Sequence, residues 1–338
     1  MSISKLLGLI ILVLLSAFLF FNWPLKRSSQ VAEQAQIEIA QAELQETEAE
    51  DIVEESAMED SSITLVEDPA ALPIVSRSSE QELPKDVDRM GQLFEPSSSM
   101  LPIVETITYS SRVDWLKERP AYLGDYAIHF QTPKHFMARS LKGIGSYLSE
   151  AVSKGDKFNV YRKDKEIEFH IVLDLSRLKM WVYYFDVEEN EKVLLKSYPV
   201  CAGRLDSKKS SGCLTPTGIF KLGSEVAVYK PGTIGLWRNQ KKDMASIFGV
   251  RWIPLEKEIA NGSESCKGLG FQGVPLKQLD SGGYFENQEC IGRYESNGCI
   301  RLLTKDIEEL FAVVISKPTY VHIVTDFVDA QLPGKEKI

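Results

Sequence analysis

The sequence predicts a mainly β domain with one or two helices in its C-terminal half. Ahead of it we expect a small α+β module, a disordered acidic stalk and an N-terminal apolar helix. From Glu166 onward, short runs rich in Val, Ile, Tyr and Phe alternate with turn clusters such as residues 206–212. Only Thr304 to Ile315 has clear helical spacing of apolar residues in that half.

The N-terminal apolar run, Leu6 to Trp23, has the length of a membrane-spanning helix. Its 18 residues would reach about 27 Å as a helix, close to the thickness of a bilayer core. No small-x-small cleavage site directly follows it, and there is no lipobox cysteine. Residues 1–27 are therefore predicted to be an uncleaved signal anchor, with a cleaved signal peptide as the alternative.

A strongly acidic stretch follows the apolar run. Residues 31–100 carry 18 Asp and Glu against 3 Lys and Arg, although the whole chain has a net charge of only −9. Such a composition, with few aromatic residues, is typical of a solvated spacer. Residues 28–100 are predicted to be a disordered linker that lets a tethered domain reach a polymeric substrate.

The segment 101–162 reads as a small α+β module. Residues 138–153 have helical spacing, and residues 155–160 read as a turn into a strand. The module is either a glycan-binding-like repeat or a packing extension of the following domain. We place that domain at residues 163–328, with a tail at 329–338.

Five cysteines, all in the C-terminal half, indicate export. An odd count fits two disulfides plus one reactive thiol in an oxidising compartment, and the spacing suggests the pairs Cys201–Cys213 and Cys266–Cys290. No Cys-x-x-Cys spacing supports a metal site. Neither a Gly-rich phosphate loop nor a basic cluster with aromatic residues is present, so no cofactor and no nucleic acid partner is predicted.

The most informative motif is the heptapeptide from Ser296 to Leu302. It should deliver Cys299 just ahead of the helix that begins near Thr304, where backbone N–H groups and the helix dipole favour a thiolate. Gly298 would allow close approach of a substrate, and neighbouring N–H groups would stabilise an oxyanion. The alternative is a structural cysteine, buried or in a disulfide.

Several elements in order resemble the L,D-transpeptidases, the YkuD-type family. These are the strand pair 171–183, residues 198–203, the Thr-Pro-x-Gly-x-Phe element at 215–220, residues 248–253, Gly270–Gly273 and the Ser-x-Gly-Cys-Ile-Arg motif at 296–301. The resemblance covers roughly residues 165–326. It implies a β-sandwich-like fold and acyl transfer without a metal or cofactor.

The resemblance also implies a role for each site residue. Cys299 would be the nucleophile, Gly298 would contribute to the oxyanion site, and Arg301 would hold a substrate carboxylate or form a structural ion pair. Ser296 would orient the base region or cap the loop. In the family, a histidine precedes the nucleophile as general base, and Gln272 stands at that position here. A glutamine amide cannot accept a proton near neutral pH.

Three functions follow from these expectations. The first is a peptidoglycan L,D-transpeptidase that transfers a stem peptide from its diamino acid–D-alanine bond to an amine and forms an adduct with carbapenems. The second is a peptidoglycan-binding pseudoenzyme, impaired by Gln272, and the third is an envelope structural protein. In each case we expect inner-membrane anchoring with the domain facing the periplasm or exterior. Residues 274–295 would form either a lid over the site or a tolerated surface insertion.

Overall fold

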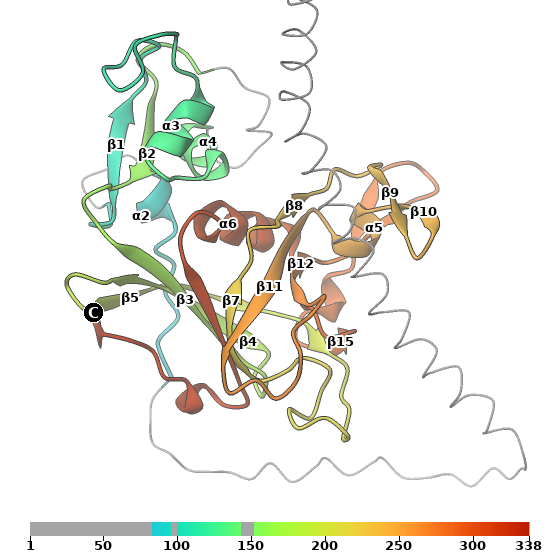
Figure 1. Ribbon diagram of the computed structural model, residues 1–338. Helices are drawn as coiled ribbons and strands as arrows, with labels where there is room; N and C mark the ends of the chain where they lie inside the picture. The colour runs from blue at the N-terminus through green and yellow to red at the C-terminus, as the bar shows by residue number, and fades with distance from the viewer. Residues whose placement is uncertain (1–82, 96–99, 143–151, 338) are drawn as a thin grey trace, which may run out of the picture. The chain divides into compact units, whose positions relative to one another are not determined.

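The computed structural model describes residues 83–95, 100–142 and 152–337 (Figure 1). The predicted anchor at residues 1–27 and the predicted linker up to residue 82 lie outside these ranges. Among the helices within them, none has both the length and the apolar character needed to span a membrane.

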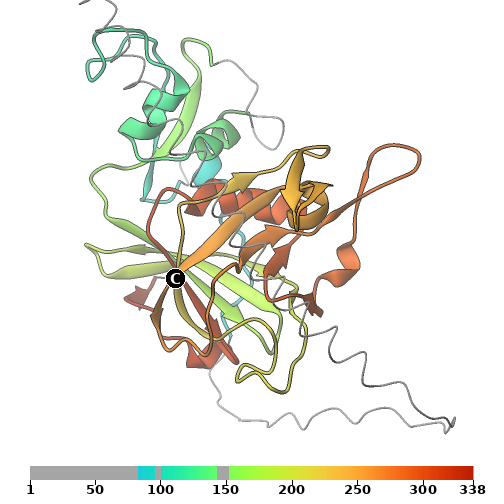
Figure 2. The same ribbon diagram turned by 45° about the vertical axis from the view of Figure 1, so that its right-hand side comes forward.

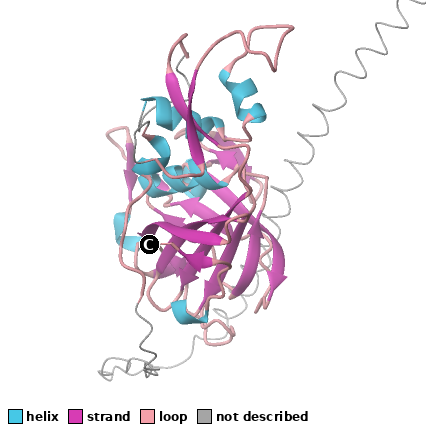
Figure 3. Ribbon diagram, turned by 90° about the vertical axis from the view of Figure 1, so that its left-hand side faces the viewer, coloured by secondary structure: helices cyan, strands magenta, loops and turns pink. Residues whose placement is uncertain are grey.

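One mixed sheet of ten strands dominates the described part of the chain (Figures 1 and 3). Its strands are β3 (Ile167–Asp174), β4 (Lys179–Asp186), β5 (Glu191–Pro199), β7 (Gly218–Leu222), β8 (Ala227–Val228), β11 (Arg251–Ala260), β12 (Gly270–Gly273), β16 (Ile300–Leu302), β17 (Thr319–Val324) and β18 (Lys335–Glu336). The order across the sheet is β16-β12-β11-β7-β17-β3-β4-β5-β18, with β8 paired to β11. The pairs β3–β17, β5–β18 and β12–β16 are parallel, and the other pairs are antiparallel.

The sheet is curled, and its concave side is filled by α6 (Thr304–Val314) and the main core (Figures 1 and 2). Alternate residues of β3 point to this core, together with apolar residues of α6: Phe169, Ile171, Leu173, Ile307, Leu310 and Phe311. The other face of β3 is buried as well, because Val172 packs with Trp181 under Phe327 and Leu332. Burial on both faces explains the nearly unbroken apolar run in this strand.

The predicted mainly β character is confirmed, whereas the predicted two-layer sandwich gives way to a single curled sheet. The outer face of β3 and β4 is covered by chain segments instead of a second sheet. These segments include η3 (Phe327–Asp329) and the residues around Val87. A local pattern of apolar residues reports that both faces of a strand are buried, but it does not report what covers them.

The segment between residues 100 and 162 has its own strand pair and a small core. The antiparallel strands β1 (Val104–Thr108) and β2 (Lys157–Tyr161) pack with α3 (Leu123–His129) and α4 (Lys134–Lys142) around Tyr126 and Phe158. This segment also contacts α6, because the Tyr161 hydroxyl donates a hydrogen bond to the Val313 carbonyl at 2.9 Å. The short helix α2 (Gly91–Phe94) contributes to the main core.

Three further strand pairs are separate from the main sheet: β6 (Ala202–Gly203) with β15 (Tyr294–Ser296), β9 (Ile234–Trp237) with β10 (Gln240–Asp243), and β13 (Leu276–Gln278) with β14 (Tyr284–Glu286). Helices α5 (Ala245–Phe248) and η2 (Gln288–Cys290) follow β10 and β14 in the chain. The segment that contains β13, β14 and η2 projects from the sheet in Figure 2 (orange, right). Its hairpin is held at the end nearest the turn, because Tyr284 pairs with Gln278 there and the Tyr284 hydroxyl donates to Asp243 at 3.0 Å.

Candidate active site

The loop between β15 and β16 carries Cys299 in a conformation that requires glycine. Gly298 has a φ of +109°, and a Cβ at this position would lie 2.9 Å from the Leu214 carbonyl oxygen. Both features exclude a side chain. Cys299 follows with only 7% of its surface exposed, and its Sγ lies 4.0 Å from the Gly268 carbonyl oxygen.

Two buried hydroxyl groups brace this loop from opposite sides. Ser296 Oγ donates to the Cys299 carbonyl at 2.6 Å and accepts from the Gly298 N–H at 3.1 Å. Thr215 Oγ1 accepts from the Gly203 N–H and donates to the Gly298 carbonyl, both at 2.8 Å. Ser296 and Thr215 are fully buried. The Thr215 bond fixes the peptide that joins Gly298 to Cys299, and the Ser296 bonds fix the peptides on either side of it.

The two braces bear on the roles expected from the sequence. Of the two roles expected for Ser296, its hydrogen bonds correspond to capping of the loop. The Gly298 N–H already donates to Ser296, so support of an oxyanion by Gly298 would require this bond to open. The sequence predicts no role for Thr215 beyond its place in the Thr-Pro-x-Gly-x-Phe element. Its position in a Thr-Pro pair just before β7 is the sequence feature that points to a structural role.

The helix behind Cys299 begins at Thr304, as the sequence predicts, but it lies too far along the chain for its dipole to act on the Cys299 thiol. Strand β16 follows Cys299, and α6 starts only at Thr304. Three extended residues span about 10 Å, and the effect of a helix dipole fades within a turn. Moreover, the Thr304 N–H donates to a Glu286 carboxylate oxygen, so this helix start already faces a negative charge. Thr304 is the first helical residue, and Leu303 takes the N-cap position.

Gln272 lies on the strand next to the one that follows Cys299. In the parallel pair of β12 and β16, Gln272 is in register with Arg301, and Phe271 with Ile300. Phe271 and Ile300 point into the main core, so Gln272 and Arg301 lie on the opposite face, as does Cys299 by alternation. An offset of two residues along neighbouring strands separates the Cα atoms of Gln272 and Cys299 by about 8 Å. The Gln272 amide donates to the Ile247 carbonyl at 3.3 Å.

Arg301 stands in a row between Gln272 and Cys201. Its backbone exchanges two hydrogen bonds with Cys201, at 2.9 and 3.0 Å. Its Nε is buried and has no hydrogen-bond partner among the described residues. A buried guanidinium nitrogen without a partner is compatible with the expected role of Arg301 in binding an anionic group.

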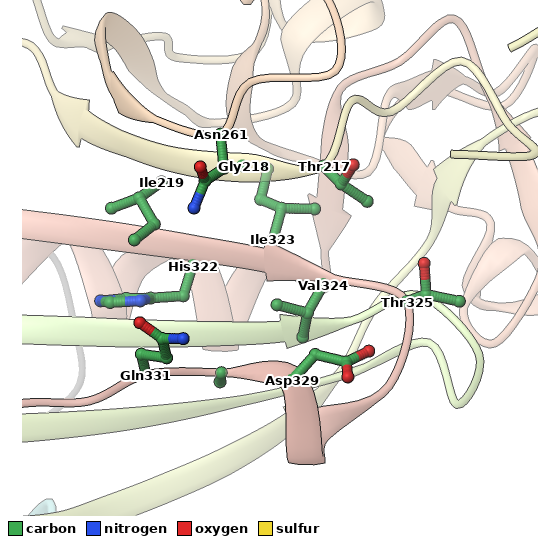
Figure 4. A pocket seen from close by; sticks show the side chains of 11 residues that line it. Thr217, Gly218, Ile219, Asn261, His322, Ile323, Val324, Thr325, Asp329 and Gln331 are labelled. Carbon is green, nitrogen blue, oxygen red and sulfur yellow. The ribbon is translucent and has the colours of Figure 1, made fainter. Parts of the chain in front are cut away.

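None of the four histidines, all of which lie in the described part of the chain, belongs to β12, to β16 or to the loop that carries Cys299. His322 on β17 contacts His170 on β3, with a distance of 3.1 Å between their ring nitrogens. His322 also lines a pocket of about 260 Å³ between Asn261 and Gln331 (Figure 4). Four strand intervals separate β17 from β16, or about 19 Å. His129 and His135 belong to α3 and α4, and the His135 ring packs against Phe311 of α6.

The predicted disulfides are not formed. All five cysteines lie in the described residues, are buried and form no disulfide. Cys213 and Cys266 belong to the main core, whereas Cys201 and Cys290 share a separate small cluster with Val274. The nearest neighbour of Cys201 in this set is therefore Cys290, and the predicted pairing was wrong. Because the two expected disulfides are not formed, the odd number of cysteines is no longer an argument that the protein is exported.

A known protein family matches the part of the chain that carries this loop. Residues 168–323 match the family YkuD, the L,D-transpeptidase catalytic domain. This part of the chain is a YkuD-family domain. The YkuD match extends from β3 to β17, and it indicates a peptidoglycan-related function in the cell envelope.

Solved structures give weaker likenesses to the chain. The helical cell shape determining protein Pgp2 from Campylobacter jejuni is 17% identical, with a TM-score of 0.32, over 50% of this chain and 51% of that one. Bd1075 from Bdellovibrio bacteriovorus is 18% identical, with a TM-score of 0.29, over 47% and 48%. The chain thus spans about half the length of each. No curated protein matches it.

Proposed function

We propose that this protein is a peptidoglycan L,D-transpeptidase with Cys299 as its nucleophile. The observation that carries the proposal is the cysteine loop of the YkuD domain. There, Gly298 has a backbone conformation that only glycine adopts readily. Thr215 bonds the peptide before Cys299, and Ser296 bonds the peptides on either side of it. A loop held by several buried hydrogen bonds is what a positioned nucleophile requires.

The chemistry follows from a thiolate on Cys299. Its sulfur attacks the carbonyl between the diamino acid and the terminal D-alanine of a stem peptide, and the oxyanion forms beside the Cys299 N–H. D-Alanine leaves with a proton, and a thioester remains. An amine from a second stem then attacks the thioester and releases the thiol. Arg301, next to the loop, would bind a carboxylate of the stem. None of these steps requires a metal or a cofactor.

The mechanism requires that the Cys299 thiol lose its proton, and position 272 does not supply a base for this step. Gln272 takes the base position, and its amide donates to the Ile247 carbonyl, so it offers no basic atom. The thiolate must therefore form by loss of the proton to water or to the substrate amine. This observation favours a second candidate function, a peptidoglycan-binding protein that retains the fold and has lost the acyl transfer.

Tethering to the inner membrane remains part of the proposal. The apolar run Leu6–Trp23 would be the anchor and residues 28–82 the spacer, with the domain facing the periplasm or exterior. The spacer is shorter than the sequence predicts, because Met90, Leu93 and Phe94 are buried in the main core. N-terminal sequencing of the mature protein tests this, since a start beyond residue 30 would mean cleavage.

Intact-mass spectrometry after incubation with a carbapenem distinguishes the two functions. A transpeptidase should gain the mass of one carbapenem, Cys299→Ala should gain none, and Cys266→Ala should behave as the unmodified protein. If no adduct forms while the protein still sediments with purified peptidoglycan sacculi, the second function holds. Absence of both adduct and sedimentation contradicts both functions.

A further inference from the structure

Cys201 and Cys290 form a buried pair of thiols beside the candidate active site. Cys201 is fully buried and Cys290 is 4% exposed. They share one apolar cluster with Val274, against which Ile291 and Leu303 pack. The remaining three cysteines lie outside this cluster.

Backbone hydrogen bonds hold the two cysteines close together. The Gly292 N–H donates to the Val200 carbonyl at 2.9 Å, and the Ala202 N–H donates to the Arg293 carbonyl at 3.2 Å. Cys201 is therefore flanked on both sides by residues bonded to the segment just after Cys290. The Arg293 N–H also donates back to the Cys290 carbonyl at 3.1 Å, which closes a turn over the pair.

The side chains are in contact as well. The Cys290 thiol makes a hydrogen bond with Cys201, and the Cys201 thiol lies 3.6 Å from the Ala202 carbonyl oxygen. Two thiols in hydrogen-bond contact need only a small adjustment of their side chains to reach the geometry of a disulfide.

We propose that Cys201 and Cys290 are a redox-reactive dithiol that takes a low-molecular-weight disulfide as oxidant and becomes an intramolecular disulfide. A thiolate of the pair attacks one sulfur of the oxidant, which releases one small thiolate and leaves a mixed disulfide on the protein. The second cysteine then attacks the mixed disulfide and releases the other small thiolate. Two protein protons pass to the two small thiolates, and two electrons pass from the protein to the oxidant.

The disulfide would link the segment that contains β13, β14 and η2 to the residue just before β6, the strand that pairs with β15. Cys201 is bridged to Arg301, and the residues after it pair with β15, which leads to Cys299. The disulfide would thus restrain the later part of the connection between Gln272 and Cys299, on the side of Cys299. This inference does not depend on catalysis by Cys299.

The environment of the pair predicts the rate of the reaction. Burial raises the pKa of the Cys290 thiol to about 11, and burial also raises the pKa of Cys201, while the charge of Arg301 opposes the rise at both. Because the thiolate is the reactive form, oxidation of the folded protein should be slow at neutral pH and faster at pH 9.

Peptide mapping of the full-length protein tests the proposal. The reduced protein is incubated with oxidised glutathione at pH 9, alkylated after denaturation and digested without reduction. We expect a peptide cross-linked through Cys201 and Cys290, with Cys213, Cys266 and Cys299 alkylated. A cross-link between any other pair, or alkylation of both Cys201 and Cys290, overturns the proposal.

Two variants complete the test. In Cys290→Ala the cross-link should be lost and Cys201 should retain glutathione, whereas Cys266→Ala, also a buried cysteine, should keep the cross-link. Hydrogen exchange on the unmodified protein gives a readout that needs no variant. The amides of Gly292 and Arg293 should exchange more slowly after oxidation, and equal exchange in both forms contradicts the restraint.

Discussion

The hydroxyl group of Thr215 should determine both the stability of the domain and the reactivity of Cys299. Replacement by valine keeps the shape of the side chain and removes the oxygen. The Gly203 N–H then loses its acceptor and the Gly298 carbonyl loses its donor, and both contacts are 2.8 Å in the folded protein. Each unsatisfied buried group costs about 1–3 kcal/mol, so the loss of both contacts in Thr215→Val should lower the free energy of unfolding by about 2–6 kcal/mol.

Serine is the matched control at this position. Thr215→Ser keeps the oxygen and removes one buried methyl group, which costs about 1 kcal/mol. The midpoints of urea unfolding measure both changes. For a domain of this size, each kcal/mol also lowers the melting temperature by about 3 °C, which gives a second readout.

The rate of carbapenem adduct formation at Cys299 should differ more between Thr215→Val and Thr215→Ser than their stabilities do. The Gly298 carbonyl and the Cys299 N–H belong to one planar peptide and point in opposite directions, so the Thr215 bond orients that N–H. Thr215→Val should therefore slow carbapenem adduct formation, and Thr215→Ser should leave it nearly unchanged. Equal stabilities and equal rates for valine and serine would refute the assignment of these two hydrogen bonds.

Three further changes have definite expected outcomes. Gln272→His should speed adduct formation by about 10²–10⁴-fold, which corresponds to a barrier lower by about 3–5 kcal/mol. An unchanged rate in a folded variant contradicts the assignment of position 272 as the site of the base. Gly298→Ala should destabilise by more than about 2 kcal/mol in urea unfolding, whereas Gly292→Ala, with φ of +79° but open space around its Cβ, should cost less. Burial lowers the pKa of His170 to about 3 and of His322 to about 4. The unfolded chain binds these protons near pH 6.5, so stability should fall as the pH drops from 7.5 to 5, by about 2 kcal/mol for one imidazole, and less so in His322→Gln.

The parts of the fold that the sequence predicted well are those with a strong local pattern. The helix expected from Thr304 to Ile315 is found from Thr304 to Val314, because its apolar residues repeat along one face over three turns. The strand pair at 171–183 is likewise found in β3 and β4. The strand β16 was missed because three residues are too few to show a period of two.

Other parts depend on contacts that no local pattern encodes. The partner of Cys201 is Cys290, 89 positions away, and it is set by the pairing of residues 200–202 with residues 292–293. Spacing along the chain could not reveal this pairing. The brace from Thr215 to Gly298 joins residues 83 positions apart for the same reason. Whether strands form one curled sheet or two layers also depends on long-range order, since β16 pairs with β12 and not with β15.

The parallel pairing of β12 with β16 changes the meaning of the 26 residues between Gln272 and Cys299. The chain must return to the starting edge before it can run again in the same direction, and a parallel pair needs a connection of about a dozen residues or more. The projecting hairpin is therefore built on an obligatory return path. Shortening this connection by roughly half should be tolerated, because about a dozen residues are still enough to join two parallel strands. A longer deletion would prevent β16, which carries Arg301, from pairing with β12, and Cys299 would then lose its position as well.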